Sequence, residues 1–364
     1  MDNQKPTTWV KYWLIIGAVM ILIQIVLGGI TRLTGSGLSI TKWDIVTGIV
    51  YPLNKESWKD HFELYKATPQ FQKINKGISL DQFKFIFFWE YFHRLWARLM
   101  GFVFIIPLIY FLWKKEIPRW MFGKLAITFL LACFVASLGW IMVVSGLINR
   151  PWVNAYKLSF HLCAAILLLA YLLWIIFLAY GRIQIDFIKR DRVFINSLFI
   201  LLCVQIFFGG VMSGMKASMV APTWPSINGF FFPVEIKYLF SSDVAMLNEY
   251  EQNAKVPIVI QFIHRIVAYV IFILMTVLFI KNVSSGNRSD RTISLVAFIL
   301  TLFQMLVGIL TLINSKGEVP LLYGALHQLN AILLFCLVLY VWFHLIFKES
   351  IRIKVSNSQT EFNY

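Results

Sequence analysis

Eight long apolar runs dominate this chain and restrict it to one class of fold. Each is close to the ~20 residues that a helix needs to cross a bilayer. Asp, Glu, Lys and Arg make up 14% of the chain, against about 25% in a soluble domain. Lipid leaves exposed strand edges without hydrogen-bond partners, so the spans should be helices. We therefore predict an all-α integral membrane protein with eight transmembrane helices, near residues 13–31, 88–113, 123–147, 157–180, 194–215, 257–280, 292–313 and 321–347.

The positive charge is distributed unevenly between the loops. With the N-terminus in the cytoplasm, the inner segments hold sixteen Lys and Arg residues and the three shorter outer loops hold six. Basic residues are retained on the cytoplasmic side of membrane proteins. The net charge of +15 is explained in this way, and we predict no nucleic-acid partner. The expected location is the cell inner membrane, with both termini cytoplasmic and a long outer loop at roughly 32–87.

The second half of the chain repeats motifs of the first half. Matched positions are separated by 181, 171, 165 and 166 residues, so the loops differ in length. Each half has an even number of spans, which gives both halves the same orientation, as in parallel repeats. We predict two four-helix bundles, residues 1–182 and 183–364. The matched motifs are Gly28-Gly29 with Gly209-Gly210, His93-Arg94 with His264-Arg265, Leu147-Ile148-Asn149 with Leu312-Ile313-Asn314, and His161 with His327.

Four of the six histidines occupy these matched positions, two in each half. All four are expected near the outer ends of their helices, at similar depth. A single histidine in a span is usually a hydrogen-bonded core residue, but ionisable groups repeated inside spans are functional by default. Facing imidazoles within a bundle suit axial ligation of haem iron. Zinc would need more ligands, and the four cysteines all lie inside apolar runs, where we expect them buried and unpaired. The predicted ligand pairs are His93 with His161 and His264 with His327.

An arginine follows the first histidine of each pair. The planar guanidinium of Arg94 or Arg265 suits a haem propionate. The alternative is an arginine that extends its charge to the membrane interface. The matched glycine pairs would let a backbone or a flat macrocycle approach closely, or would serve ordinary helix packing.

One matched position differs in charge between the halves. Glu90 precedes His93 by three residues and shares its helix face, whereas Gln261 precedes His264. A carboxylate at a membrane edge is costly unless it is used or paired. It would act as a general base or stabilise positive charge on a reacting carbon; the alternative is a salt bridge to Arg94 or Arg98. The difference favours the first half as the reaction site and the second half as a structural or electron-transfer site.

These motifs resemble those of the heme A synthase family, in its longer mitochondrial and bacterial form. The similarity covers about residues 12–345, and its most specific element is the ExxHR motif with three further histidines in register. This chain lacks the cysteine pair that some members carry in the first outer loop. The matching stretches are residues 28–39, 83–94, 156–162, 223–225, 264–269 and 324–328.

The resemblance implies a substrate, a cofactor and partners. Haem O would lie between His93 and His161, and haem b between His264 and His327, with Glu90 essential. Two successive hydroxylations would convert one methyl group of haem O into the formyl group of haem A. The implied partners are the haem O synthase that supplies the substrate, a membrane electron acceptor and the assembly of cytochrome oxidase. A homo-oligomer is compatible with the sequence.

Two other classes fit parts of the pattern. A dihaem b-type electron-transfer cytochrome would use both histidine pairs equally, which the difference between Glu90 and Gln261 opposes. A transporter with parallel repeats would have broken helices near the midplane of the membrane. The polar residues of this chain gather instead near one edge.

Overall fold

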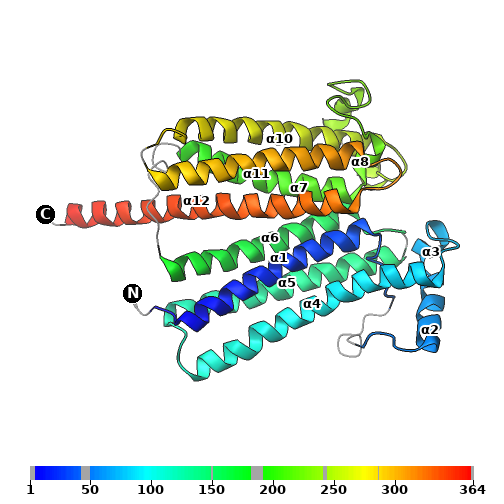
Figure 1. The fold of residues 1–364 in the computed structure, drawn as a ribbon, viewed down its shortest axis with the longest axis horizontal. Helices are drawn as coiled ribbons and strands as arrows, with labels where there is room; N and C mark the ends of the chain where they lie inside the picture. The colour runs from blue at the N-terminus through cyan, green and yellow to red at the C-terminus, as the bar shows by residue number, and fades with distance from the viewer. Residues whose placement is uncertain are drawn as a thin grey trace.

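The protein is almost entirely helical in its computed structural model, which describes residues 5–41, 50–148, 151–181, 192–240, 244–285 and 287–361 (Figure 1). Its described part contains no strand beyond one isolated bridge, Ile227 with Phe230. Eight helices are long and apolar enough to cross a membrane. They are α1 (Thr8–Leu33), α4 (Leu80–Trp113), α5 (Arg119–Ile148), α6 (Ala155–Tyr180), α7 (Arg192–Gly214), α10 (Lys255–Asn282), α11 (Arg288–Ile313) and α12 (Leu321–Glu361). The predicted all-α membrane fold with eight spans is confirmed.

The short helices lie between the spans. They are α2 (Lys55–Lys66), α3 (Pro69–Lys73), α8 (Ala217–Val220), the 3₁₀-helix η3 (Val234–Phe240) and α9 (Val244–Asn248). All of them belong to the segments that follow α1 and α7. They therefore gather at one end of the molecule, called here the capped end, opposite the two chain termini (Figure 1).

The long helices pack as two groups of four. In the second half, α7, α10, α11 and α12 form a closed ring in which each helix packs against the next. In the first half, α1 packs against α4 and α6, and α5 packs against α6. The two groups meet where α6 packs on α7 and α1 on α12. The predicted boundary between residues 182 and 183, the charges of Arg182, Lys189 and Arg190, and Asn149 lie outside the described residues.

Helix α4 begins eight residues before the predicted edge of its span, at Leu80 rather than residue 88. A capping box starts it: the Ser79 side chain accepts from the Gln82 backbone N–H, and the Gln82 side chain accepts from the Ser79 N–H. Such reciprocal caps satisfy backbone groups that a helix start leaves unpaired. The added turns bury Phe83 and Phe87. His93 consequently lies more than three turns from the start of α4, further than expected.

Helices α2 and α3 pack on this extension of α4 through an aromatic cluster of Trp58, Tyr65, Phe83, Ile86 and Phe87. The Tyr65 hydroxyl donates to Gln70 Oε1 at 3.0 Å and accepts from Asn75 Nδ2 at 2.7 Å. Burial raises the pKa of Tyr65 to about 12, so this donor is retained at neutral pH. Gln70 in turn donates to the Gly35 carbonyl at 2.9 Å, which ties α3 to the segment after α1.

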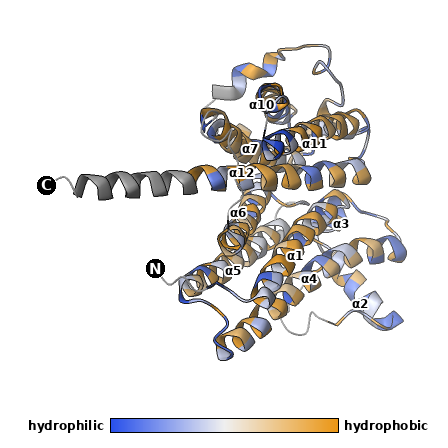
Figure 2. Cartoon of the chain, turned by 60° about the vertical axis from the view of Figure 1, so that its left-hand side comes forward, coloured by the Kyte–Doolittle hydropathy of each residue, from blue (hydrophilic) through white to orange (hydrophobic). Residues whose placement is uncertain are grey.

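Apolar residues cover most of the surface of the long helices (Figure 2). The spans are continuous over their described lengths, unlike the broken helices of the transporter alternative. The four cysteines are unpaired as predicted, but Cys133 and Cys203 are exposed. Burial was wrongly inferred for these two because an apolar run that faces lipid resembles an apolar run that faces the core.

Candidate haem-binding site

One cavity of about 1510 Å³ runs through both groups of helices. A pocket for a single drug-sized ligand has roughly 300–1,000 Å³, so this space suits more than one large ligand. All eight long helices contribute to its lining. The structure thereby brings together the complete set of residues predicted from the sequence, namely Glu90, His93, Arg94, His161, His264, Arg265 and His327.

Each of the four histidines packs against a glycine of the preceding span. A Cβ atom added to Gly28 would lie 3.2 Å from His93 Nε2, and one added to Gly209 would lie 3.3 Å from His264 Cε1. In the second pair of helices of each half, the corresponding distances are 3.0 Å from Gly139 to His161 Cε1 and 2.7 Å from Gly308 to His327 Cε1. The glycines leave the space that the imidazole rings occupy.

Gly139 and Gly308 were missed in the sequence, and the cause is a register error. The Leu-Ile-Asn motifs align α5 with α11 at an offset of 165 residues, but the glycines that meet the histidines are 169 residues apart. The difference of four residues is close to one helical turn. The motif match therefore placed the correct helices together but one turn out of register. The offsets at Gly28 and His93 agree with the matched contacts.

The two histidines of the second half face each other. The ring centres of His264 and His327 are 6.4 Å apart. Metal–nitrogen bonds of about 2 Å on opposite sides of one ion would place two imidazole centres about 6 Å apart. Gln205 Nε2 lies 3.1 Å from His264 Nε2, and Gln304 Nε2 lies 3.0 Å from both His327 Nδ1 and the His327 carbonyl oxygen. Sequence reasoning overlooked both glutamines.

The first half lacks these amide contacts to the rings. At the offset of 181, the counterpart of Gln205 is Gln24, which donates to the backbone carbonyl of His93 at 3.2 Å. At the offset of 169, the counterpart of Gln304 is Val135. Nδ1 of His161 is buried without a hydrogen-bond partner among the described residues. The imidazoles of the second half are thus held by side chains to a degree that those of the first half are not.

Glu90 is buried, at 3% exposure, and all its partners are donors. Its Oε2 accepts from the Ser39 backbone N–H at 2.7 Å, the Ser39 hydroxyl at 2.7 Å and the Ile40 N–H at 2.9 Å. Its Oε1 accepts from Arg94 at 2.5 Å. The salt bridge considered in the sequence therefore exists. Glu90 also lines the cavity one turn from His93, so the ion pair does not remove it from the site.

The second half fastens its matching loop with the opposite polarity. Gln261 Nε2 donates to the carbonyl oxygens of Ala221 at 3.1 Å and Ala217 at 3.4 Å. In both halves a side chain one turn before the histidine holds the segment that follows the first span. A carboxylate meets backbone N–H groups in one half, and an amide meets carbonyl groups in the other. Part of the difference between Glu90 and Gln261 is thus explained by the loops that they hold.

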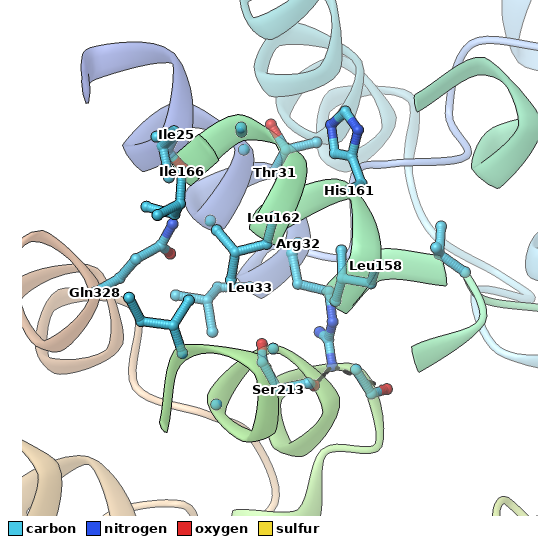
Figure 3. Close-up of a pocket in the computed structure, with 18 of the residues that line it drawn as sticks. Ile25, Thr31, Arg32, Leu33, Leu158, His161, Leu162, Ile166, Ser213 and Gln328 are labelled. Carbon is cyan, nitrogen blue, oxygen red and sulfur yellow. Dashed lines mark hydrogen bonds between the residues drawn. The ribbon is translucent and has the colours of Figure 1, made fainter. Parts of the chain in front are cut away.

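The two arginines also hold these loops. Arg265 donates to the carbonyl oxygens of Thr223 at 2.6 Å, Ser226 at 3.2 Å and Pro225 at 3.3 Å, while its buried Nε has no hydrogen-bond partner among the described residues. Arg94 lies beside Glu90 and the Ile40 carbonyl. A third arginine joins the two halves: Arg32 of α1 donates to the carbonyl oxygens of Ser213 and Gly214 at the end of α7 (Figure 3). Figure 3 also shows Gln328 reaching toward Ile25, whose carbonyl accepts from it at 2.8 Å.

The donor chemistry of the cavity fits a haem group. Facing imidazoles provide two axial ligands, and the glycines beside them leave space that a Cβ would fill. Among the described residues no three His, Cys, Asp or Glu side chains gather at one point, so the arrangement is that of paired ligands. Buried polar atoms without partners, His264 Nδ1 and Arg265 Nε, face the same region of the second half.

Comparison with known proteins places the chain in a family. The model of the COX15-CtaA family, described as cytochrome oxidase assembly protein, matches residues 11–339. The chain belongs to this family. It is 38% identical to a Heme A synthase of Rickettsia africae over 91% of this chain and 96% of that protein. It is 36% identical to a Heme A synthase of Pelagibacter ubique over 96% of this chain and 99% of that protein.

Membership of the COX15-CtaA family agrees with the resemblance seen in the sequence motifs. The matched region extends from α1 into α12 and contains both histidine pairs, Glu90 and both arginines. The match also covers the segments that hold Glu90 and Arg265 in place. The whole cavity therefore lies within the part of the chain that defines the family.

Proposed function

We propose that this protein is a heme A synthase, an oxidoreductase that converts one methyl group of haem O into the formyl group of haem A. Relatives that match nearly the whole chain carry that name. The observation that carries the proposal is the unequal construction of two otherwise matched halves. A carboxylate lines the cavity beside His93, and amides contact the rings of His264 and His327.

We assign the substrate to the first half and the cofactor to the second. His93 and His161 would hold the iron of haem O, and His264 and His327 would hold haem b. Haem b supplies one-electron transfer when bound, toward a membrane electron acceptor. The glutamines that contact His264 and His327 suit a resident group, because partners that fix ligand orientation strengthen metal binding. The fewer contacts around His161 suit a group that is exchanged in every reaction cycle.

Glu90 would supply the charge for the reaction. Each hydroxylation adds one oxygen to the methyl carbon, and the resulting gem-diol loses water to leave the formyl group. Positive charge develops on that carbon as it is oxidised. A carboxylate fixed by Ser39, Ile40 and Arg94 needs little reorganisation to stabilise this charge, which is the condition for strong electrostatic catalysis. Arg94 and Arg265 would contact propionates with the N–H groups that face the cavity.

A dihaem cytochrome is the main alternative. It would require equivalent sites, yet the halves differ at Glu90 and Gln261, at Gln304 and Val135, and in the contacts of their histidines. No observation on the described residues favours it over the synthase.

The test separates the charge of Glu90 from its role in holding the loop. Purified Glu90→Gln and Ser39→Ala variants would be supplied with haem O, and haem A formation would be measured. Glu90→Gln should bind haem O and retain haem b, but lose on the order of 10²-fold or more of its activity, as expected for one preorganised electrostatic contact. Ser39→Ala removes hydroxyl hydrogen bonding but keeps the charge, so its activity should stay near the wild-type value. Near-normal haem A formation by Glu90→Gln, or an equal loss in both variants, would assign Glu90 to loop fastening alone.

A further inference from the structure

Helices α4 and α5 separate from each other. Of all consecutive pairs of spans in the described part of the chain, theirs is the pair whose backbones make almost no close contact. The corresponding pair in the second half, α10 and α11, packs closely. The two helices are also the least buried of the eight, and α4 lies along the outside of its group (Figure 1). The first bundle is therefore open on one side, where the second is closed.

The cavity extends to this opening. Ile105 of α4 and Phe129 and Trp140 of α5 line the cavity, and each is more than 40% exposed. Toward the end with the chain termini, the Phe104 and Phe129 rings approach to 6.3 Å and close the gap. Toward the capped end, α3 packs against α5. We call the opening between these limits the window; its cavity-lining residues are Ala97, Gly101 and Ile105 of α4 and Phe129, Ala132, Ala136 and Trp140 of α5.

The second half fills the equivalent place with larger side chains. At the offset of 171, Gly101 corresponds to Phe272, which packs 6.4 Å from Phe298 of α11. A Cβ atom at Gly101 would meet nothing within 4 Å. At the offset of 169, Ala136 corresponds to Met305. The repeat thus shows what a closed seam requires, and the first half lacks it.

On the basis of the proposed function, we propose that the window is the lateral entrance for haem O from the bilayer, and that the prenyl chain of the substrate lies in it between Gly101 and Ala136. A resident cofactor needs no such route, which accounts for the closed seam of the second bundle. A substrate that arrives and a product that leaves in every cycle do need one. The long hydrocarbon chain distinguishes haem O from haem b, and an apolar opening continuous with lipid and with the histidine pocket can hold it without exposing it to water.

The test closes the window with the residue of the second half. Gly101→Phe has space for its first side-chain atom and favours the helix, so the variant should fold and keep its resident haem b. Its affinity for haem O should fall about tenfold or more, because each displaced CH₂ group costs a factor of roughly 4 in affinity. Its affinity for protohaem, which lacks the prenyl chain, should change much less. Leu99→Phe, on an exposed α4 position outside the cavity lining, is the matched control and should bind haem O like the wild type.

The outcomes distinguish this proposal from the proposed function. If wild-type protein forms no haem A from haem O, the function itself is wrong. If wild-type protein forms haem A and Gly101→Phe binds haem O normally, the window is not the binding place of the chain. An equal loss for both haems would contradict the placement of the prenyl chain. A changed oligomeric state with unchanged haem O affinity would mean that a second copy of this protein covers the seam.

Discussion

Each histidine of the cavity depends on one glycine. The imidazole positions are set by the absence of a Cβ atom on the neighbouring span, most tightly at Gly308, where that atom would lie 2.7 Å from His327 Cε1. Contacts this short force a side chain or a backbone to shift. The four glycines are therefore as specific to the site as the ligands that they accompany.

Alanine at these glycines should act on one haem at a time. Gly308→Ala should displace His327 and lower haem b content, since disturbing the support of a metal ligand weakens metal binding about 10–100-fold. Gly139→Ala should leave haem b in place and weaken haem O binding. Gly123→Ala is the control, because a Cβ there meets nothing within 4 Å. Absorption spectra of the purified variants give the result, and unchanged haem b in Gly308→Ala would remove the glycine from the site.

At the scale of elements, each half fastens a loop onto its second span. Gln261 and Arg265 bind the carbonyl groups of the segment 217–226, and Glu90 and Arg94 bind the segment 39–40. These contacts place the loop beside the histidine pocket. A loop held in this way both closes the pocket and fixes the arginine that lines it.

Arg265 is the residue on which the second loop depends most. Arg265→Leu leaves three carbonyl groups without their donor, at a cost of about 1–3 kcal/mol for a buried unsatisfied group. Haem b retention during purification should fall clearly in Arg265→Leu and less in Arg265→Lys, which keeps the charge but not the planar fork. Lys255→Leu removes a charge from the start of the same helix and should retain haem b. Wild-type haem b occupancy in both Arg265 variants would show that the arginine neither fastens the site nor contacts a propionate.

The sequence predicted the helices well and their mutual register less well. Span number and type followed from hydropathy, which the bilayer makes reliable. The start of α4 did not, because its first turns are stabilised by a capping box and by packing on α2 rather than by lipid. The register of α5 and α11 was one turn out, because a short motif near a helix end competed with the contact at Gly139. The loop contacts of Glu90 join residues fifty positions apart, which no local pattern reveals.

At the scale of the whole molecule, two similar bundles share one cavity but are built for different tasks. The second is closed, and amides contact its histidine rings. The first is open between α4 and α5 and has a carboxylate beside His93. Arg32 joins the bundles at the end of α7. This division predicts one resident haem and one exchanged haem in the same chain.

The haem types extracted from purified protein test this division most directly. Wild-type protein from cells that make haem O should yield haem b together with haem O or haem A. His327→Ala should lose haem b, whereas His161→Ala should keep haem b and contain neither haem O nor haem A. Wild-type protein that yields only haem b, two per chain, with one lost in each variant, would contradict the account and identify a dihaem cytochrome instead.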